Sequence, residues 1–145
     1  MDSALRPAGQ PPVPLSALVS GLGLTGDTGS RALVTGITLD SRTVGHGWLY
    51  VALPGTRAHG AEFAGSAVAA GAAAILTDDE GRRILGPDPG AAVVAAEDAR
   101  AAMALVSARL FGEPARQLAT FAVTGTNGKT TTVALLQAGL AAAGR

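Results

Sequence analysis

The residues best suited to chemistry form the segment GTNGKTT, which spans residues 125–131 of the 145-residue sequence. Its glycines let the backbone curl so that successive N–H groups point into one concavity, and a helix that starts there favours an anion. Lys129 is placed to reach the terminal phosphates of a nucleotide, and Thr130 to ligate a Mg²⁺ ion that bridges them. The segment therefore predicts a phosphate-binding loop made of Gly125, Thr126, Asn127, Gly128, Lys129, Thr130 and Thr131.

The flanks of this segment have the context that such a loop needs. The apolar run before it predicts a buried strand over 118–125, and the pattern after it predicts a helix over 130–143. The general P-loop pattern places another glycine where Val123 stands, so the match is incomplete. The alternative is a glycine-rich turn with a solvated lysine, and the strand-to-helix context favours the phosphate loop.

Polar residues also follow two expected strands in the first half of the chain. Asp40-Ser41-Arg42 ends the run ALVTGITLD, and Thr56-Arg57-Ala58 follows WLYVALPG. Polar residues at such strand ends are candidate ligand-binding groups, because α/β sheets bind ligands there. An ordinary polar turn remains the alternative for residues 40–42. Asp78, Asp79 and Glu80 are interpreted as a solvated connection, and His46 and His59 as surface or loop histidines without a catalytic partner.

The elements that must position these residues alternate along the chain. We expect strands at 33–39, 48–53, 73–77 and 91–95, with helices from Leu15, over 61–71 and over 98–111, the last capped by Asp98. The helix over 61–71 is expected to have Phe63, Ala67, Val68 and Gly71 on one face. This alternation predicts an α/β fold with a largely parallel sheet. The domain organisation expected is a disordered leader over 1–14, a domain over 15–112, and the start of a second domain over 113–145.

Composition limits the class of protein. Apolar residues make up 48% and charged residues 15%, enough for a core, and aromatic residues only 3%, so that core must be aliphatic and closely packed. Eleven basic and eleven acidic side chains cancel, which argues against nucleic acid as a partner. There is no cysteine, signal peptide or apolar run of about 20 residues. A cytoplasmic monomer without membrane insertion is expected.

Three segments together resemble the Mur ligase family: TGTNGKTT in the loop, ITLDSRTVGHGWLYVALPG in the first half, and HGAEFAGSAVAAGAAAILTDD after it. The resemblance implies a Rossmann-like UDP-binding N-terminal domain, followed by the start of a P-loop ATPase domain that binds ATP with Mg²⁺. Lys129 would then be the catalytic residue and Thr130 the metal ligand. Such ligases have three domains, so the sequence is expected to be an incomplete fragment, inactive by itself.

The resemblance also implies which residues hold the uridine-diphosphate end of the substrate. The matching positions are Leu39, Ser41, Thr56, Arg57 and Ala58. The sequence departs from relatives at three nearby positions: Trp48 where Asp or Asn is common, Thr56 where some have His, and His59 where Asp often precedes the glycine.

Within the family, the sequence is most similar to the ligases that add the third stem-peptide residue (the MurE type). These use ATP to activate UDP-N-acetylmuramoyl-L-alanyl-D-glutamate as an acyl phosphate, which the amino group of meso-diaminopimelate or L-lysine attacks. The alternatives are the D-alanyl-D-alanine-adding ligase (the MurF type), a non-catalytic UDP-sugar-binding module, and an unrelated small P-loop kinase.

Overall fold

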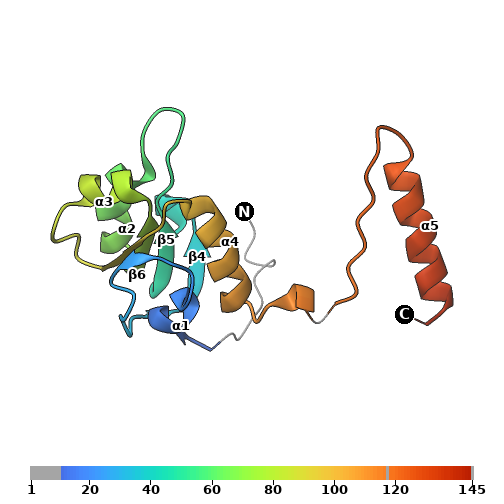
Figure 1. Cartoon of the computed structure of the whole chain (residues 1–145), viewed down its shortest axis with the longest axis horizontal. Helices are drawn as coiled ribbons and strands as arrows, with labels where there is room; N and C mark the ends of the chain where they lie inside the picture. Colours follow the sequence, from blue (N-terminus) through green and yellow to red (C-terminus); the bar gives the residue numbers. More distant parts are fainter. Residues whose placement is uncertain (1–10, 117, 145) are drawn as a thin grey trace. The chain divides into compact units, whose positions relative to one another are not determined.

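The computed structural model describes residues 11–116 and 118–144 (Figure 1). The chain divides into two compact units, one ending at Glu113 and one beginning at Pro114. The strands of the first unit are β1 (Val13–Pro14), β2 (Thr25–Gly26), β3 (Leu33–Val34), β4 (Gly36–Thr38), β5 (Trp48–Val51), β6 (Ala72–Thr77) and β7 (Ala92–Ala95). Its helices are α1 (Leu15–Val19), α2 (Ala64–Ala69), α3 (Asp79–Leu85) and α4 (Ala99–Leu110), with 3₁₀ turns η2 (Ser41–Thr43) and η3 (Gly60–Phe63).

Five strands form the main sheet, in the order β2-β7-β6-β5-β4. Strands β4 to β7 are parallel, and β2 is antiparallel to β7 at one edge. Strands β1 and β3 form a separate antiparallel pair. The expected α/β fold with a largely parallel sheet is confirmed.

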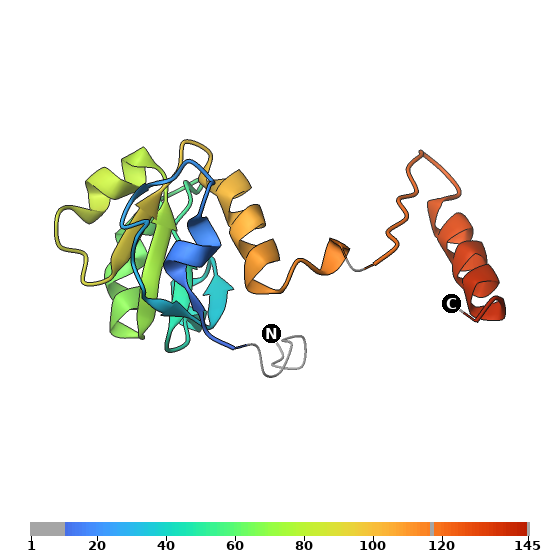
Figure 2. The same ribbon diagram turned by 60° about the horizontal axis from the view of Figure 1, so that its bottom comes forward.

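Helices cover both faces of this sheet, as Figures 1 and 2 show. Alternate side chains along a strand point to opposite faces, so β5 sends Leu49 and Val51 to one face and Tyr50 to the other. The first face packs against α1 and α4, and the second packs against η3 and α2. Alanines make up most of the buried residues on the second face, so its helices can lie close to the sheet. Leucine and valine make up most of those on the first face, and the core is aliphatic, as expected from the scarcity of aromatic residues.

The helix α4 follows the sequence prediction closely. The carboxylate of Asp98 accepts a hydrogen bond from the backbone N–H of Ala101 at 2.9 Å and so caps the helix. Buried side chains recur at three- and four-residue spacing on the face toward the sheet: Ala99, Ala102, Val106 and Leu110. Met103 is partly buried and packs at the margin of this stripe.

The N-terminal part of the unit differs from the prediction. Val13 and Pro14 pair with β3, so the expected disordered leader does not include them, and residues 1–10 lie outside the described residues. The strand expected over 33–39 is two strands in two sheets. Between them, the N–H of Thr35 donates to the carbonyl of Gly47 at 2.9 Å instead of joining either ladder.

Two local predictions around the second helix are wrong. Phe63 was expected to share one helix face with Ala67, but Phe63 is 49% exposed and Ala67 is buried, because 60–63 is a 3₁₀ turn and the buried face consists of Ala61, Ala64 and Ala67. The charged stretch interpreted as a solvated connection contains α3, whose first turn is capped by Asp78. Charges concealed this helix because most of its side chains face solvent.

The second unit contains the 3₁₀ turn η4 (Pro114–Arg116) and the helix α5 (Lys129–Ala142). The strand expected over 118–125 is not formed in the described part of this range. A strand needs a neighbour to accept its backbone hydrogen bonds, and the described residues supply none here. No helix among the described residues is both long and apolar enough to cross a membrane.

Candidate functional site

The residues predicted to hold a uridine diphosphate follow two neighbouring parallel strands. Thr38, the last residue of β4, lies opposite Tyr50 of β5. Leu39 and Ser41 come directly after β4, and residues 56–58 come shortly after β5. Because parallel strands end at the same edge of a sheet, the structure brings both segments to one edge, where α/β sheets commonly bind ligands.

Asp40 organises the turn after β4. Its carboxylate accepts the backbone N–H of Arg42 at 3.0 Å and the guanidinium Nε and Nη2 of the same residue at 2.9 and 2.8 Å. These bonds to the Arg42 side chain and backbone lower the pKa of Asp40 from 3.8 to about 2. Ser41 therefore lies in a turn fixed by its two neighbours, beside the exposed side chain of Leu39.

The loop after β5, residues 54–59, closes on itself. Pro54 and His59 form an isolated antiparallel bridge, and the N–H of Gly55 donates to the carbonyl of Ala58 at 3.1 Å. Thr56 and Arg57, at the tip, are exposed. We call residues 54–59 the tip loop.

His59 has partners that sequence reasoning missed. Its Nε2 lies 3.1 Å from Oδ1 of Asp78, which follows β6, and its Nδ1 accepts the N–H of Ala61 at 3.0 Å. His59 does follow β5 in a loop, but the alternative of a surface histidine is wrong, because the side chain is only 9% exposed. A capping residue such as Asp98 can be predicted because it directly precedes its helix in the sequence. The contact between His59 and Asp78 has no such local pattern.

A hollow of about 600 Å³ lies at the ends of β5, β6 and β7, next to the base of the tip loop. Its charged lining consists of three carboxylates and one guanidinium, from Asp78, Glu97, Asp98 and Arg100. This lining disfavours a phosphate there. Arg57, exposed on the tip loop, is the better placed cation for an anionic ligand at this edge.

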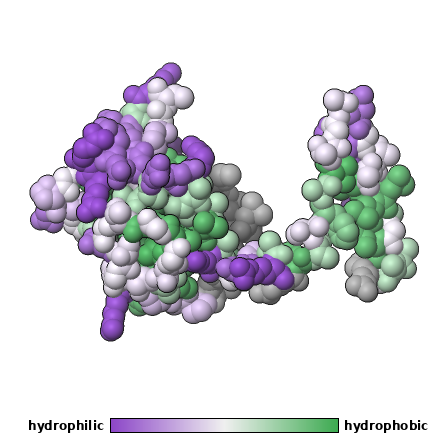
Figure 3. Space-filling view, viewed as in Figure 1, coloured by the Kyte–Doolittle hydropathy of each residue, from purple (hydrophilic) through white to green (hydrophobic). Residues whose placement is uncertain are grey.

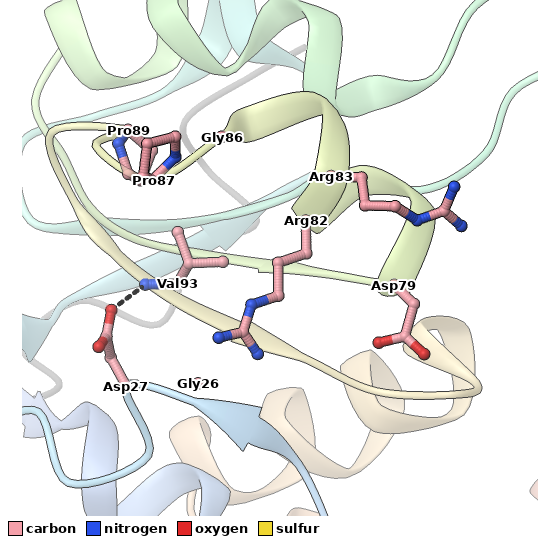
Figure 4. Close-up of a pocket in the computed structure, with 9 residues that line it drawn as sticks. All are labelled: Gly26, Asp27, Asp79, Arg82, Arg83, Gly86, Pro87, Pro89 and Val93. Atoms are coloured by element: carbon pink, nitrogen blue, oxygen red, sulfur yellow. Dashed lines mark hydrogen bonds between the residues drawn. The ribbon is translucent and has the colours of Figure 1, made fainter.

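A hollow of about 710 Å³ lies elsewhere, between α3 and the β2 edge of the sheet (Figure 4). The Arg82 guanidinium extends between Asp27 and Asp79 there and donates to Thr25 at 3.2 Å. Asp27 accepts the N–H of Val93 at 2.9 Å. These contacts join α3 to the sheet edge, and no residue predicted to bind a ligand lines this hollow.

In the second unit, the expected phosphate loop leads directly into α5. Gly125 and Gly128 have φ angles of 143° and 79°, in the region that favours glycine. The Lys129 ammonium donates to the carbonyls of Gly125 and Thr126, so it folds back over the loop. Residues 124–131 are exposed, and the structure thus gathers the predicted glycines and lysine in one tight turn at a helix start.

The described residues of neither unit offer an evident metal site, and those of the second expose apolar side chains. Within residues 11–116 and 118–144, no group of three His, Asp or Glu side chains could hold a metal ion. Exposed apolar side chains gather on the second unit, as Figure 3 shows, and include Leu118, Phe121, Val133 and Leu135.

Comparison with known proteins gives consistent matches. The family model described as "Mur ligase family, catalytic domain" matches residues 33–112, within the first unit. A UDP-N-acetylmuramoyl-L-alanyl-D-glutamate–2,6-diaminopimelate ligase from Streptomyces coelicolor is 44% identical over 135 residues, which cover 93% of this chain and 26% of the relative. The ligase of the same name from Caulobacter vibrioides is 52% identical over 99 residues, 68% of this chain and 19% of the relative.

Solved structures agree with this assignment. A UDP-N-acetylmuramoylalanyl-D-glutamyl-2,6-diaminopimelate–D-alanyl-D-alanyl ligase from Acinetobacter baumannii superposes with a TM-score of 0.64 at 25% identity, covering 87% of this chain and 27% of that one. A MurF crystal structure from the same organism gives 0.63 at 26% identity, covering 85% and 26%. The chain spans about a quarter of the length of the first two curated relatives. The family match covers more than half of the sequence, and the chain belongs to the Mur ligase family.

Proposed function

We propose that this chain is the N-terminal part of a cytoplasmic, ATP-dependent ligase of peptidoglycan precursor synthesis. The reaction adds meso-diaminopimelate, or L-lysine, to UDP-N-acetylmuramoyl-L-alanyl-D-glutamate. The observation that carries the proposal is that residues 39–41 and 56–58 follow two neighbouring parallel strands, β4 and β5, and so come after the same edge of the sheet. The curated relatives named for this reaction, at 40–52% identity, support the choice of substrate.

The first unit would hold the uridine-diphosphate end of the substrate. Leu39 offers an exposed apolar surface for the base, and Ser41 and the tip loop offer a hydroxyl and backbone amides. Arg57 would pair with the diphosphate. The acidic hollow beside the tip loop disfavours phosphate, which supports Arg57 as the partner of the diphosphate.

The second unit would bind the ATP phosphates. Its two glycines with positive φ, the helix start and the Lys129 ammonium fit such a group, provided that the ammonium leaves the carbonyls it now contacts. Lys129 would neutralise charge on the β- and γ-phosphates, and Thr130 would ligate Mg²⁺. These roles are electrostatic stabilisation and positioning. In the proposed reaction the γ-phosphoryl group passes to the D-glutamyl γ-carboxylate, and phosphate leaves when the incoming amine attacks.

The test is a titration of the 145-residue chain with uridine, UDP and UDP-N-acetylmuramic acid, in which binding is monitored by changes in the amide chemical shifts. We expect shifts clustered on residues 39–42 and 55–58. Arg57→Ala should weaken UDP but not uridine, and Arg83→Ala, an exposed arginine on α3, should weaken neither. A folded chain without shifts at these residues at millimolar ligand would refute the assignment.

The second candidate function is a UDP-sugar-binding module without catalysis. The exposed phosphate loop and the unformed strand before it favour this function for the 145-residue chain taken alone. We expect this chain to bind UDP but to release no ADP in the presence of ATP, UDP-dipeptide and amino acid. ADP release that requires all three would show that the chain is a complete enzyme.

A further inference from the structure

We propose that the His59–Asp78 pair is a latch that fixes the conformation of the tip loop, and that His59 is thereby a positioning residue for the uridine ligand. This inference rests on the proposed function for the identity of the ligand. The juxtaposition joins the loop after β5 to the start of α3, two segments 19 residues apart in the sequence.

The tip loop is held mainly at its base. The N–H of Gly60 donates to the carbonyl of Leu53 at 2.9 Å, and the buried Tyr50 hydroxyl donates to the carbonyl of Gly60 at 2.8 Å. Toward the tip, the Gly55–Ala58 hydrogen bond is the contact that closes the turn. Arg57 and Thr56 are exposed beyond it, so their position depends on how firmly the base is fixed.

The ring of His59 connects that base to α3. Its Nδ1 accepts the N–H of Ala61, so the proton of the neutral ring is on Nε2, which donates to Asp78 at 3.1 Å. The same oxygen of Asp78 accepts the N–H of Gly81 at 2.7 Å. Both ring nitrogens are thus engaged, which suits a positioning role and leaves neither as a proton acceptor for a substrate.

Close packing restricts the ring to this place. A Cβ at Gly81 would lie 2.6 Å from Cε1 of His59 and 1.9 Å from Oγ1 of Thr77. Thr77 is itself fixed, because its buried hydroxyl donates to the carbonyl of Ala52 at 2.8 Å. The side chains of His59 and Asp78 are only 9% and 19% exposed, so their hydrogen bond is largely shielded from competing water.

The rival explanation is that His59 matters only as the N-cap of η3, through Ala61. Two substitutions separate the explanations. The side-chain oxygen of His59→Asn can replace Nδ1 and keep the cap, but its amide is too short to reach Asp78. The amide of His59→Gln can replace Nε2 and keep the bond to Asp78, but it loses the cap.

The experiment measures UDP affinity of the 145-residue chain by NMR, together with hydrogen exchange at the Gly55 amide. We expect His59→Asn to weaken UDP affinity about tenfold and His59→Gln to keep an affinity near that of wild type. A tenfold loss corresponds to a loop that adopts the binding conformation only about a tenth of the time. Arg109→Ala, which removes hydrogen bonds to Leu18 and Ser20 at the opposite edge, controls for lost stability and should not change UDP affinity.

The outcomes are distinguishable from failure of the proposed function. If His59→Asn binds UDP like wild type, or His59→Gln binds as weakly as His59→Asn, the latch is overturned. If wild type does not bind UDP, the proposed function fails, and the latch is then tested by hydrogen exchange at the Gly55 amide alone. Faster exchange in His59→Asn than in His59→Gln then supports a fixed loop, and equal exchange overturns it.

Discussion

At the scale of single residues, short polar side chains shape the candidate uridine site. Asp40 holds both the backbone and the guanidinium of Arg42, and Asp78 holds both His59 and the start of α3. Each carboxylate thus accepts more than one hydrogen bond in a turn that follows a parallel strand. The residues proposed to touch ligand, Ser41 and Arg57, lie next to these organising residues rather than among them.

The Asp40–Arg42 contact makes a pH-dependent prediction. The pKa of Asp40 is lowered to about 2, so whatever the pair contributes to the turn is fully present above about pH 4 and is lost as the pH falls through 2. Carboxyl NMR should show this low midpoint in wild type. Arg42→Ala should return the pKa toward 3.8, and Arg31→Ala, an arginine outside this turn, should leave it low. A midpoint near 3.8 in wild type would contradict the contact.

Lys129 makes the prediction for catalysis. In an active ligase that carries this sequence, Lys129→Ala should lower kcat/KM more than tenfold, because a loss above about 1.4 kcal/mol is expected for a group that stabilises phosphate charge. UDP binding should persist, because the uridine residues lie in the first unit. Gln137→Ala, on the same helix, is the matched control and should keep activity. Retention of more than a tenth of kcat/KM in Lys129→Ala would contradict the role.

At the scale of elements, the sequence predicted those whose pattern is local. Strands β6 and β7 are short apolar runs between turns, and α4 has both a capping aspartate and a periodic apolar face. The pairing of β1 and β2, two residues each, depends on contacts with residues 33–34 and 94–95, which no local pattern indicates. The prediction of a strand over 118–125 was wrong although its local pattern is strand-like. A strand also needs a neighbouring strand to pair with, and no local pattern shows whether one is present.

The same distinction applies to the candidate site. Motif residues such as Ser41 and Arg57 could be proposed from the sequence because they follow strand-like runs. Residues 39–41 and 56–58 could also be expected at one edge of the sheet, because the sequence predicts that the strands before them are parallel. The His59–Asp78 contact could not be predicted, because it depends on how two loops and α3 pack, and Asp78 looked like part of a solvated connection.

The packing of α3 against the sheet predicts an unequal response to two glycine substitutions. Gly81→Ala should lower the free energy of unfolding by about 1–3 kcal/mol, because the added methyl group collides with Thr77 and His59. Gly65→Ala, on α2 with open space around it, should be neutral or slightly stabilising. Urea denaturation of both variants measures the difference. Equal stability of the two would show that α3 can move away from His59 at little cost.

At the scale of the whole molecule, the two units differ in what holds them together. The first has a core on both faces of its sheet, whose buried residues end at Leu110 and against which Phe111 also packs. In the second, no residue of α5 is buried, and large apolar side chains such as Phe121 and Leu135 are exposed. Isolated helices of this length are marginal in water, so the stability of the chain is expected to come from the first unit.

This difference predicts how the chain responds to truncation at Glu113, the end of the first unit. A chain of residues 1–113 should unfold cooperatively with a Tm within about 3 °C of the 145-residue chain, since 1 kcal/mol corresponds to roughly 4–8 °C in a domain of this size. It should also keep its affinity for UDP, because residues 39–41 and 56–58 are all retained. The matched peptide, residues 114–145, should show weak helicity by circular dichroism and no cooperative transition.

A fall in Tm of more than about 8 °C on truncation would mean that the first unit depends on the second for stability. Unchanged Tm with lost UDP binding would instead place part of the uridine site beyond Glu113.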